Sequence, residues 1–349
     1  MKTIGFFKLI ADFKPPLLIA EISANHDKSL DQLLDLIDIS YSAGWNCVKL
    51  QTYTAESLTL KSSHPSLKID KMWGEANLYD LYKRAAMPME FHEPAFKKIK
   101  DYKMKTLSSV YDPRDIDFLE KLGCEAYKIA SFELNYHDLL LELAQTGKEI
   151  IVSTGMASIE EVRKSIEVLR KNTSDSKISV LHCCSAYPAP LNEVNLRAII
   201  TLKQEFNLSI GFSDHTIGHE AAVLAYSFGA QIIEKHVTND TKRLGPDHRF
   251  SAEKDVLIAI KEGIKKVMEM SGTGIKQTTI SEQINREKGR RSAFATLDIK
   301  KGEYLSYQNF RFVRPGVGIP PDQGPILGLK VNKDIPYGHP ILWEDLIVK

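Results

Sequence analysis

The sequence predicts an α/β protein in which a closed parallel (β/α)8 barrel, the TIM barrel, is followed by a small β-rich module. Eight short apolar runs alternate with helical stretches over residues 17–270, which matches the number and length that such a barrel needs. The runs are rich in Ile, Val and Leu without strict alternation, as are strands buried on both faces. After residue 284 the sequence changes to short β-type runs with many Gly and Pro residues, which indicates a separate module.

The expected strands are short apolar segments separated by helical or turn residues. They are Leu17–Ile22, Cys47–Gln51, Thr106–Val110, Ala126–Ala130, Ile150–Ser153, Ile178–Cys183, Leu208–Phe212 and Gln231–Lys235. An open doubly wound sheet is the competing arrangement, and a Gly-rich phosphate loop after the first strand would favour it. The first strand instead runs into Glu-Ile-Ser-Ala-Asn-His at 21–26, which contains no glycine, so the barrel is preferred.

The segments between the strands carry the spacing of amphipathic helices. Leu30–Ala43 places its apolar side chains on one face, and Ser158 with Glu161 predicts a capping box at the start of a helix over Ile159–Lys171. The longest insertion, residues 52–105 between the second and third strands, is a candidate lid.

The chain is expected to form two domains joined by a linker. The barrel is assigned residues 1–271, the small polar segment 272–284 is the linker, and residues 285–349 form the β module. Two copies of a weak repeat, which begin at Asp298 and Asp334, indicate a pseudo-twofold arrangement in that module. Its roughly 65 residues are marginal for a self-sufficient core, so the module is expected to dock on another surface.

Composition and charge exclude several classes of protein. Apolar residues make up 43% and charged residues 26% of the 349 residues, which excludes a mostly disordered chain. The 46 Lys and Arg residues balance 45 Asp and Glu residues, so no net charge draws the chain to nucleic acid or to a membrane surface. No apolar run reaches about 18 residues, the four cysteines show no CxxC spacing, and the N-terminus lacks the apolar core of a signal peptide. We therefore expect a reduced, cytoplasmic protein.

Two lysines lie inside expected strands, close in sequence to hydroxyl-bearing strand ends. A buried ammonium group is costly unless it meets an anion, so Lys49 and Lys128 need partners. One interpretation is that they pair with Glu21 or Glu133. The interpretation that we favour is that they bind a phosphate or carboxylate group of a ligand. The hydroxyl groups that would assist them belong to Ser131, Ser153 and Ser213.

Two histidines follow neighbouring strands, and their rings are expected to converge. Two neutral imidazoles such as His215 and His236 can hold a divalent metal and leave positions open for substrate oxygens. The alternative is one core histidine and one surface histidine. Asp247 is a candidate for a second layer around the metal, or for part of a polar turn. The remaining histidines are assigned to surface or capping positions: His64, His92, His137, His219 and His339.

Nine short motifs follow one another along the chain. They are IAEISANH (19–26), VKLQTYT (48–54), YKIASFE (127–133), STGMAS (153–158), LHCCSAYPAP (181–190), FSDHTIG (212–218), EKH (234–236), GPDH (245–248) and RPGVGI (314–319). In this order they resemble the sialic acid synthase family, which condenses phosphoenolpyruvate with an N-acylated hexose to a nine-carbon 2-keto acid. The C-terminal segment resembles that family's antifreeze-like (SAF) domain. ISANH, KLQTYT and KIASFE look most like the pseudaminic acid synthases, whereas GPDH is more typical of the sialic and legionaminic acid synthases.

The resemblance implies a role for each residue that its motifs align. A divalent metal, most often Mn²⁺ with Mg²⁺ or Co²⁺ as alternatives, would be held by His215 and His236. Phosphoenolpyruvate would be surrounded by Lys49, Ser109, Lys128, Ser131, Ser153 and Ser213. The catalytic carboxyl groups would be Glu21, Glu133 and Asp247, and the sugar would be contacted by Ser185, Tyr187 and Arg314. Arg314 would reach the sugar from the partner of a domain-swapped homodimer.

The expected reaction is therefore that of a pseudaminic acid type synthase acting on a 6-deoxy-diacetamido hexose, and three rivals stay open. One is a sialic or legionaminic acid synthase. Another is an aldolase that forms a Schiff base at Lys128. The last is a non-enzymatic glycan-binding protein, which the set of polar groups at the barrel end disfavours because surface binding would not require them.

Overall fold

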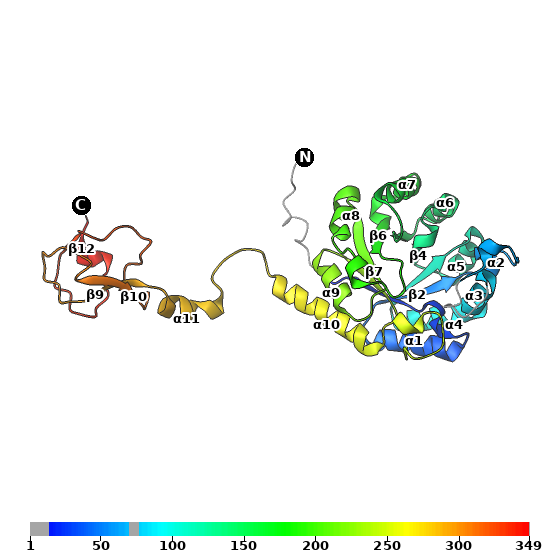
Figure 1. Cartoon of the computed structure of the whole chain (residues 1–349), viewed down its shortest axis with the longest axis horizontal. Coiled ribbons are helices and arrows are strands. Elements are labelled where there is room, and N and C mark those ends of the chain that lie inside the picture. The colour runs from blue at the N-terminus through cyan, green and yellow to red at the C-terminus, as the bar shows by residue number, and fades with distance from the viewer. Residues whose placement is uncertain (1–13, 70–76, 349) are drawn as a thin grey trace. The chain divides into compact units, whose positions relative to one another are not determined.

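The computed structural model describes residues 14–69 and 77–348 (Figure 1). Its internal contacts divide the chain into two compact units, with the division between Thr273 and Gly274. Each unit has a buried apolar cluster of its own. The two are therefore described separately.

The first unit is a closed barrel of eight parallel strands. They are β1 (Leu17–Glu21), β2 (Cys47–Thr52), β3 (Lys105–Val110), β4 (Ala126–Ile129), β5 (Glu149–Ser153), β6 (Ile178–Cys183), β7 (Ser209–Asp214) and β8 (Ile232–His236). β1 pairs with both β2 and β8, so the sheet closes, and the predicted barrel is confirmed over the open sheet. β7 and β8 end at Asp214 and His236, beyond the expected ends at Phe212 and Lys235.

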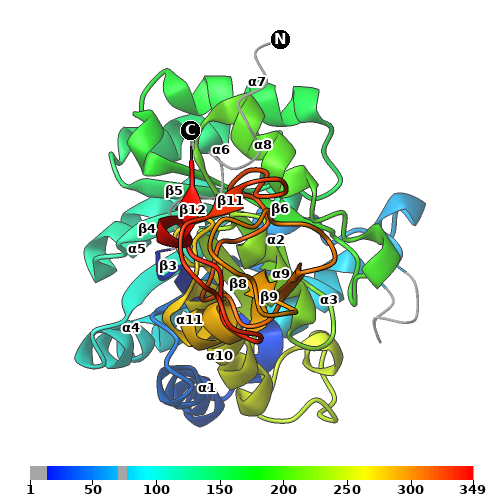
Figure 2. The same ribbon diagram turned by 90° about the vertical axis from the view of Figure 1, so that its left-hand side faces the viewer.

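Helices lie around the strands, as Figure 2 shows for α1, α4, α5 and α7. The helices of this unit are α1 (Leu30–Ser42), α2 (Ala55–Leu58), α3 (Leu78–Ala85), α4 (His92–Asp101), α5 (Ile116–Leu122), α6 (His137–Gln145), α7 (Ile159–Arg170), α8 (Ala198–Phe206), α9 (Glu220–Ser227) and α10 (Lys254–Ser271). The capping box predicted for α7 is present: Ser158 Oγ accepts from the Glu161 amide, and the Glu161 carboxylate accepts from the Ser158 amide. Among the described residues, no helix combines the length and apolar character that membrane crossing requires.

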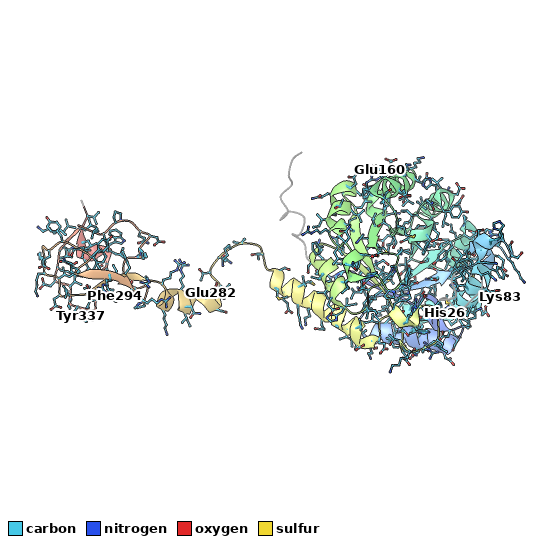
Figure 3. The ribbon with its side chains drawn as sticks, viewed as in Figure 1. His26, Lys83, Glu160, Glu282, Phe294 and Tyr337 are labelled. Atoms are coloured by element: carbon cyan, nitrogen blue, oxygen red, sulfur yellow. The ribbon has the colours of Figure 1, made fainter. Side chains whose placement is uncertain are left out.

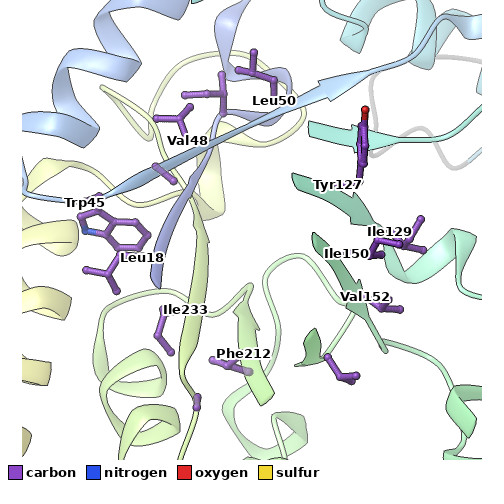
Figure 4. Packing of buried hydrophobic residues seen from close by; sticks show 14 of the residues in the cluster. Leu18, Trp45, Val48, Leu50, Tyr127, Ile129, Ile150, Val152, Phe212 and Ile233 are labelled. Atoms are coloured by element: carbon purple, nitrogen blue, oxygen red, sulfur yellow. The ribbon is translucent and has the colours of Figure 1, made fainter. Parts of the chain in front are cut away.

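Successive side chains along each strand point alternately toward the surrounding helices and into the barrel interior. Val48, Leu50 and Ile233 belong to the large cluster packed under the helices (Figure 4). The interior has a separate apolar layer: Ile19, Cys47, Leu107, Ile151, Leu181 and Ile232. Two residues further along, the same strands carry mostly polar side chains: Glu21, Lys49, Ser109, Ser153 and Glu234. A plug of apolar side chains therefore supports a polar layer at the carboxyl ends of the strands, where barrels of this kind place their active sites.

The long insertion after β2 forms short helices beside the barrel, and its residues 70–76 lie outside the described part of the chain. The hydroxyl of Tyr79 on α3 donates to Glu56 on α2 at 2.5 Å, and Lys28 Nζ donates to the Lys83 carbonyl at 2.6 Å. His26 and Lys83 accordingly lie on the same side of the barrel (Figure 3). These contacts tie α2 to α3, and α3 to the loop that follows β1.

One histidine combines a predicted cap position with an unpredicted burial. His92 was expected at the surface or as a cap, and it is the C-cap residue of the 3₁₀ turn Met89–Phe91. Its side chain is fully buried, with Nε2 2.9 Å from Thr52 Oγ1, so the surface alternative is wrong. Thr52 in turn lies 2.7 Å from Ser108 Oγ, and this hydroxyl pair supplies the polar partner that a buried imidazole needs.

The second unit contains α11 (Ile280–Gly289), β9 (Ser292–Ala295), β10 (Phe310–Val313), β11 (Lys330–Val331) and β12 (Leu346–Ile347). α11 begins inside the segment expected to be a linker. The predicted repeat is reflected in the core: Ile299, Leu305 and Phe310 of one copy and their counterparts Ile335, Ile341 and Leu346 are all buried in one cluster. Ile299 and Ile335 also pair across an antiparallel bridge, which links the two copies at equivalent positions.

Candidate active site

A cavity of about 420 Å³ opens at the carboxyl ends of the barrel strands. Of the predicted site residues, it is lined by Glu21, Lys49, Lys128, Ser131, Glu133, Ser153, Ser185, Tyr187, Ser213, His215, His236 and Asp247. Ser109 lies on β3 with its hydroxyl buried but does not line the cavity surface. Arg314 lies in the second unit, where it is exposed, and is not among the lining residues.

The floor of the cavity is a buried cluster of charges centred on Glu234. Glu234 Oε1 lies 3.0 Å from Lys49 Nζ and 3.3 Å from Lys128 Nζ, and it also accepts from Ser213 Oγ at 3.0 Å. Lys49 Nζ has a second ion pair, at 3.2 Å, with Glu21 Oε2. The lysines therefore do have protein partners. The expected pairing of Lys49 with Glu21 is present, and the shared partner of both lysines is Glu234.

This arrangement gives the two glutamates opposite shifts in pKa. Burial alone would raise the pKa of Glu234, but Lys128 and Lys49 outweigh it and lower that pKa, so the carboxylate stays ionised. Burial raises the pKa of Glu21, and its ion pair with Lys49 only partly opposes the rise. Two ammonium groups thus share one firmly ionised carboxylate, with Glu21 as a second carboxyl group beside Lys49.

Several buried polar atoms around this floor have no hydrogen-bond partner among the residues that the structure describes. Among them are Ser109 Oγ, Ser153 Oγ and Glu133 Oε2. Burial raises the pKa of Glu133 to about 7, with Lys128 opposing the rise, so near neutral pH this carboxyl group can hold or release a proton. Because buried polar groups are almost always paired, these atoms indicate a polar ligand that completes them.

A glycine allows the chain to come close at one side of the cavity. The Gly155 amide donates to Ser131 Oγ at 3.0 Å, in the turn that follows β5. A Cβ built at Gly155 would overlap Ser185 Oγ and would lie 2.9 Å from Ser131 Oγ. Any larger residue at this position would therefore displace two hydroxyl groups that line the cavity.

His215 and His236 converge as the sequence predicted. Their ring centroids are 5.5 Å apart at an interplanar angle of 75°. His215 Nδ1 lies 2.9 Å from the Cys184 carbonyl, which orients the ring and leaves Nε2 toward Ser213. Burial and the neighbouring His215 lower the pKa of His236, so its imidazole is neutral.

These two residues fit part of a metal site. His236 Nδ1 is buried without a partner, and a neutral imidazole is the form that binds a metal. Within residues 14–69 and 77–348, no three His, Cys, Asp or Glu side chains are grouped as a complete set of ligands. The remaining positions around an ion would have to be filled by oxygens from water or substrate.

The outer wall of the cavity is apolar and comes largely from the insertion after β2. Tyr53 and Tyr111 form an edge-on ring pair, with centroids 5.1 Å apart. The insertion also contributes the lining side chains of Leu58, Ile69, Leu78, Leu81, Tyr82 and Ala85. The cavity thus pairs a charged floor with an apolar side, an arrangement suited to a ligand that is charged at one end only.

Sequence reasoning gave no role in the site to several lining residues, among them Glu234, Gln51 and Ser23. Glu234 stood in the motif EKH, and the alternation of a strand would have placed it on the same face as His236. Lys235 points the other way, to Asp214 Oδ2 at 2.7 Å. The apolar wall carried no sequence signal of its own, because its residues have ordinary helical spacing.

Comparisons with known proteins agree with this geometry. The chain matches the NeuB family over residues 36–276 and the SAF domain over residues 290–347. It is 37% identical to a pseudaminic acid synthase of Campylobacter jejuni, over 95% of this chain and 97% of that protein. It is 35% identical to an N,N'-diacetyllegionaminic acid synthase of the same species, over 88% of this chain and 92% of that protein. The crystal structure of N-acetylneuraminic acid synthetase from Leptospira borgpetersenii, in complex with citrate, aligns with a TM-score of 0.69 and 30% identity over 78% of this chain and 90% of that chain.

Proposed function

Since this chain belongs to the NeuB family and carries a SAF domain, we propose that it condenses phosphoenolpyruvate with an N-acylated hexose. Its relatives include synthases of pseudaminic acid, N,N'-diacetyllegionaminic acid and N-acetylneuraminate 9-phosphate, so the chain is an enzyme that forms a carbon–carbon bond. The proposed products are a nine-carbon 2-keto sugar acid and inorganic phosphate.

The observation that carries the proposal is the pair of buried lysines beside a buried hydroxyl group without a hydrogen-bond partner. Lys49 and Lys128 share one oxygen of Glu234. Ser153 lines the same cavity, and its Oγ has no hydrogen-bond partner among the described residues. Phosphoenolpyruvate carries a carboxylate and a phosphate, so it would give the two ammonium groups further anionic partners and give Ser153 Oγ an acceptor. Phosphoenolpyruvate held by both anionic groups would also have its C3 carbon fixed in orientation toward the sugar.

The proposed chemistry can be written so that each bond and proton is accounted for. C3 of phosphoenolpyruvate attacks the aldehyde carbon of the open-chain sugar, and the aldehyde oxygen gains a proton to become a hydroxyl group. Water adds to the electron-poor C2 and loses a proton, which leaves a hydroxyl group on C2. The bond from C2 to the phosphate oxygen then breaks, the C2 hydroxyl loses its proton to become the keto group, and phosphate leaves with the bridging oxygen. Glu133, with its pKa of about 7, and the buried Glu21 are placed to move these protons or to stabilise positive charge at C2.

We further propose that His215 and His236 hold a divalent metal, most simply Mn²⁺, with Mg²⁺ or Co²⁺ as alternatives. When bound, such an ion acts as a Lewis acid toward the sugar aldehyde. The unpartnered His236 Nδ1 and the ring orientation imposed on His215 support this assignment.

For the sugar, we propose a 6-deoxy-diacetamido hexose and a product of the pseudaminic acid type. The apolar wall formed by Leu58, Leu78 and Leu81 would suit a methyl group better than a hydroxymethyl group, because a hydroxyl there would lose its hydrogen bonds to water. N-acetylmannosamine, which keeps its 6-hydroxyl, would then be the poorer substrate.

A homodimer would complete the site in this proposal. Apolar side chains on the loops after four barrel strands are exposed, namely Phe132, Met156, Leu191 and Ile217. Such a rim would be covered if the SAF domain of a partner subunit docked there, and the exposed Arg314 would then bring a guanidinium group to the sugar's N-acyl oxygen.

Mass spectrometry of products tests the proposal directly. The purified protein, with phosphoenolpyruvate and Mn²⁺, would be offered diacetamido-trideoxy hexoses and N-acetylmannosamine in separate reactions. We expect a nine-carbon 2-keto acid and equimolar phosphate, formed fastest from a 6-deoxy sugar. Borohydride reduction with pyruvate forms the control arm: a stable adduct on Lys128, whose pKa is lowered by burial, would instead favour a Schiff-base aldolase.

A further inference from the structure

Ser23 has an unfavourable backbone conformation at the edge of the cavity. It begins the short 3₁₀ turn Ser23–His26 directly after β1, and its φ is +51°. This is the left-handed region, which glycine occupies freely and other residues occupy at a cost. The side chain is only 5% exposed and lines the cavity. Strain of this kind persists where the surrounding structure uses the side chain.

The Ser23 hydroxyl links two carboxyl groups from opposite ends of the barrel sequence. It donates a short hydrogen bond to Asp247 Oδ2 and accepts one from Gln51 Nε2 at 3.3 Å. The same Gln51 nitrogen donates to Glu21 Oε1 at 2.6 Å. A continuous bridge therefore runs from Glu21 through Gln51 and Ser23 to Asp247, and all four residues line the cavity.

Other contacts fix the loop that carries Asp247 but leave its carboxylate to Ser23. The Asp247 carbonyl accepts from Ser251 Oγ at 2.6 Å. The next residue, His248, is held between Thr238 Oγ1 at 2.7 Å and Asp27 Oδ1 at 3.1 Å. Within the described part of the chain, the Asp247 carboxylate accepts hydrogen bonds only from the Ser23 hydroxyl and, at a long 3.4 Å, from the Ala24 amide. Removing the hydroxyl would thus free the carboxylate without releasing the loop.

We propose that Ser23 is a positioning residue, whose hydroxyl fixes the carboxylate of Asp247, and through Gln51 that of Glu21, against the reacting end of the sugar. This inference rests on the proposed function for its catalytic consequence. In this left-handed conformation the hydroxyl reaches both partners. Ser23 does not itself touch the reacting atoms.

Two substitutions separate the hydroxyl from the backbone. Ser23→Gly removes the hydroxyl and relieves the left-handed strain, whereas Ser23→Ala removes the hydroxyl and keeps the strain. We expect the melting temperature of the Gly variant to lie several degrees above that of the Ala variant. Both variants should lose about 10- to 100-fold in kcat/KM for the sugar, with little change in the dissociation constant of phosphoenolpyruvate. The proposal would be overturned if kcat/KM followed the melting temperature, so that the Gly variant had nearly the kcat/KM of the wild type and the Ala variant did not.

Lys103 offers a matched control, since it has a φ of +56°, is exposed and lies before β3 at the opposite end of the barrel. Lys103→Gly should raise the melting temperature as strain relief does, with turnover unchanged. A loss of turnover in this control as large as that in the Ser23 variants would contradict a specific role for the serine hydroxyl.

A double-mutant cycle, read out as melting temperature, tests the inference without using the reaction. Ser23→Ala should lower the melting temperature more in the wild-type background than in an Asp247→Ala background, because the second background has no carboxylate to hold. Equal shifts in the two backgrounds would overturn the proposed clamp. If the wild-type protein converts no sugar of the panel, the proposed function fails, and this cycle still decides whether Ser23 positions Asp247.

Discussion

Replacing Glu234 by glutamine removes the carboxylate on which both buried lysines depend. The substitution keeps the shape of the side chain but removes the charge that faces Lys49 Nζ at 3.0 Å and Lys128 Nζ at 3.3 Å. Lys49 keeps Glu21, whereas Lys128 is left with no ion pair among the described residues. The side chains of all three residues of the cluster are at most 5% exposed, so water cannot replace the lost charge.

The size of the effect follows from these distances. At an effective dielectric constant of about 20, a pair at 3.0–3.3 Å is worth about 5 kcal/mol, and Glu234 takes part in two such pairs. Part of this is returned because a buried carboxylate no longer has to be desolvated. Measured losses on breaking one side of a buried ion pair are about 3–5 kcal/mol, and we expect Glu234→Gln to lose an amount in that range.

Urea unfolding followed by circular dichroism measures this loss. Phosphoenolpyruvate should stabilise the Glu234→Gln variant more than the wild type, because the ligand then replaces the ion pair that Lys128 has lost. Glu160→Gln is a suitable control, since Glu160 pairs with Arg163 on the surface of α7 (Figure 3) and its removal should leave stability unchanged. Equal stability of the wild type and the Glu234→Gln variant would refute the view that the floor of the cavity is held by this carboxylate.

Three further predictions concern other groups in the cavity. Gly155→Ala should keep the fold but lower kcat/KM for phosphoenolpyruvate by about tenfold or more, because its Cβ displaces Ser131 and Ser185; wild-type kinetics would count against this. Binding of a polyanion should raise the pKa of Glu133 above its value of about 7, so calorimetry near neutral pH in buffers of different ionisation enthalpy should show proton uptake. Glu133→Gln should reduce that uptake. If the variant takes up as many protons on binding as the wild type, Glu133 is not the group that is protonated. His236→Ala should lose both bound metal, measured by elemental analysis, and metal-dependent turnover, whereas retained metal would exclude His236 as a ligand.

The barrel was predictable because its signals are local and repeated. Eight apolar runs and the absence of a Gly-rich loop after the first strand sufficed to choose a closed barrel. The capping box could be predicted from the four residues 158–161. The ends of the strands were less predictable from the sequence. β8 extends to His236, because the strand continues past its apolar residues into its polar end. The repeat at Asp298 and Asp334 was visible since the same buried positions recur in both copies.

The site was predictable as a set of residues, but its pairings were not. Lys49 and Lys128 were singled out because ammonium groups are rare inside apolar strands, yet their common partner on β8 comes from far along the sequence. Which carboxylate they share depends on the closure of the barrel, which brings β8 beside β1. The φ of Ser23 likewise has no sequence signal, because serine is ordinary in turns and only the backbone reveals its strain.

The cleavage of phosphoenolpyruvate tests the central claim most directly. The donor would be labelled with ¹⁸O at the oxygen that bridges C2 and phosphorus, then converted by the protein with a diacetamido-trideoxy hexose and Mn²⁺. The account predicts that the released phosphate carries the label, because the C2–O bond is the one that breaks. Unlabelled phosphate, with the ¹⁸O retained in the organic product, would contradict it.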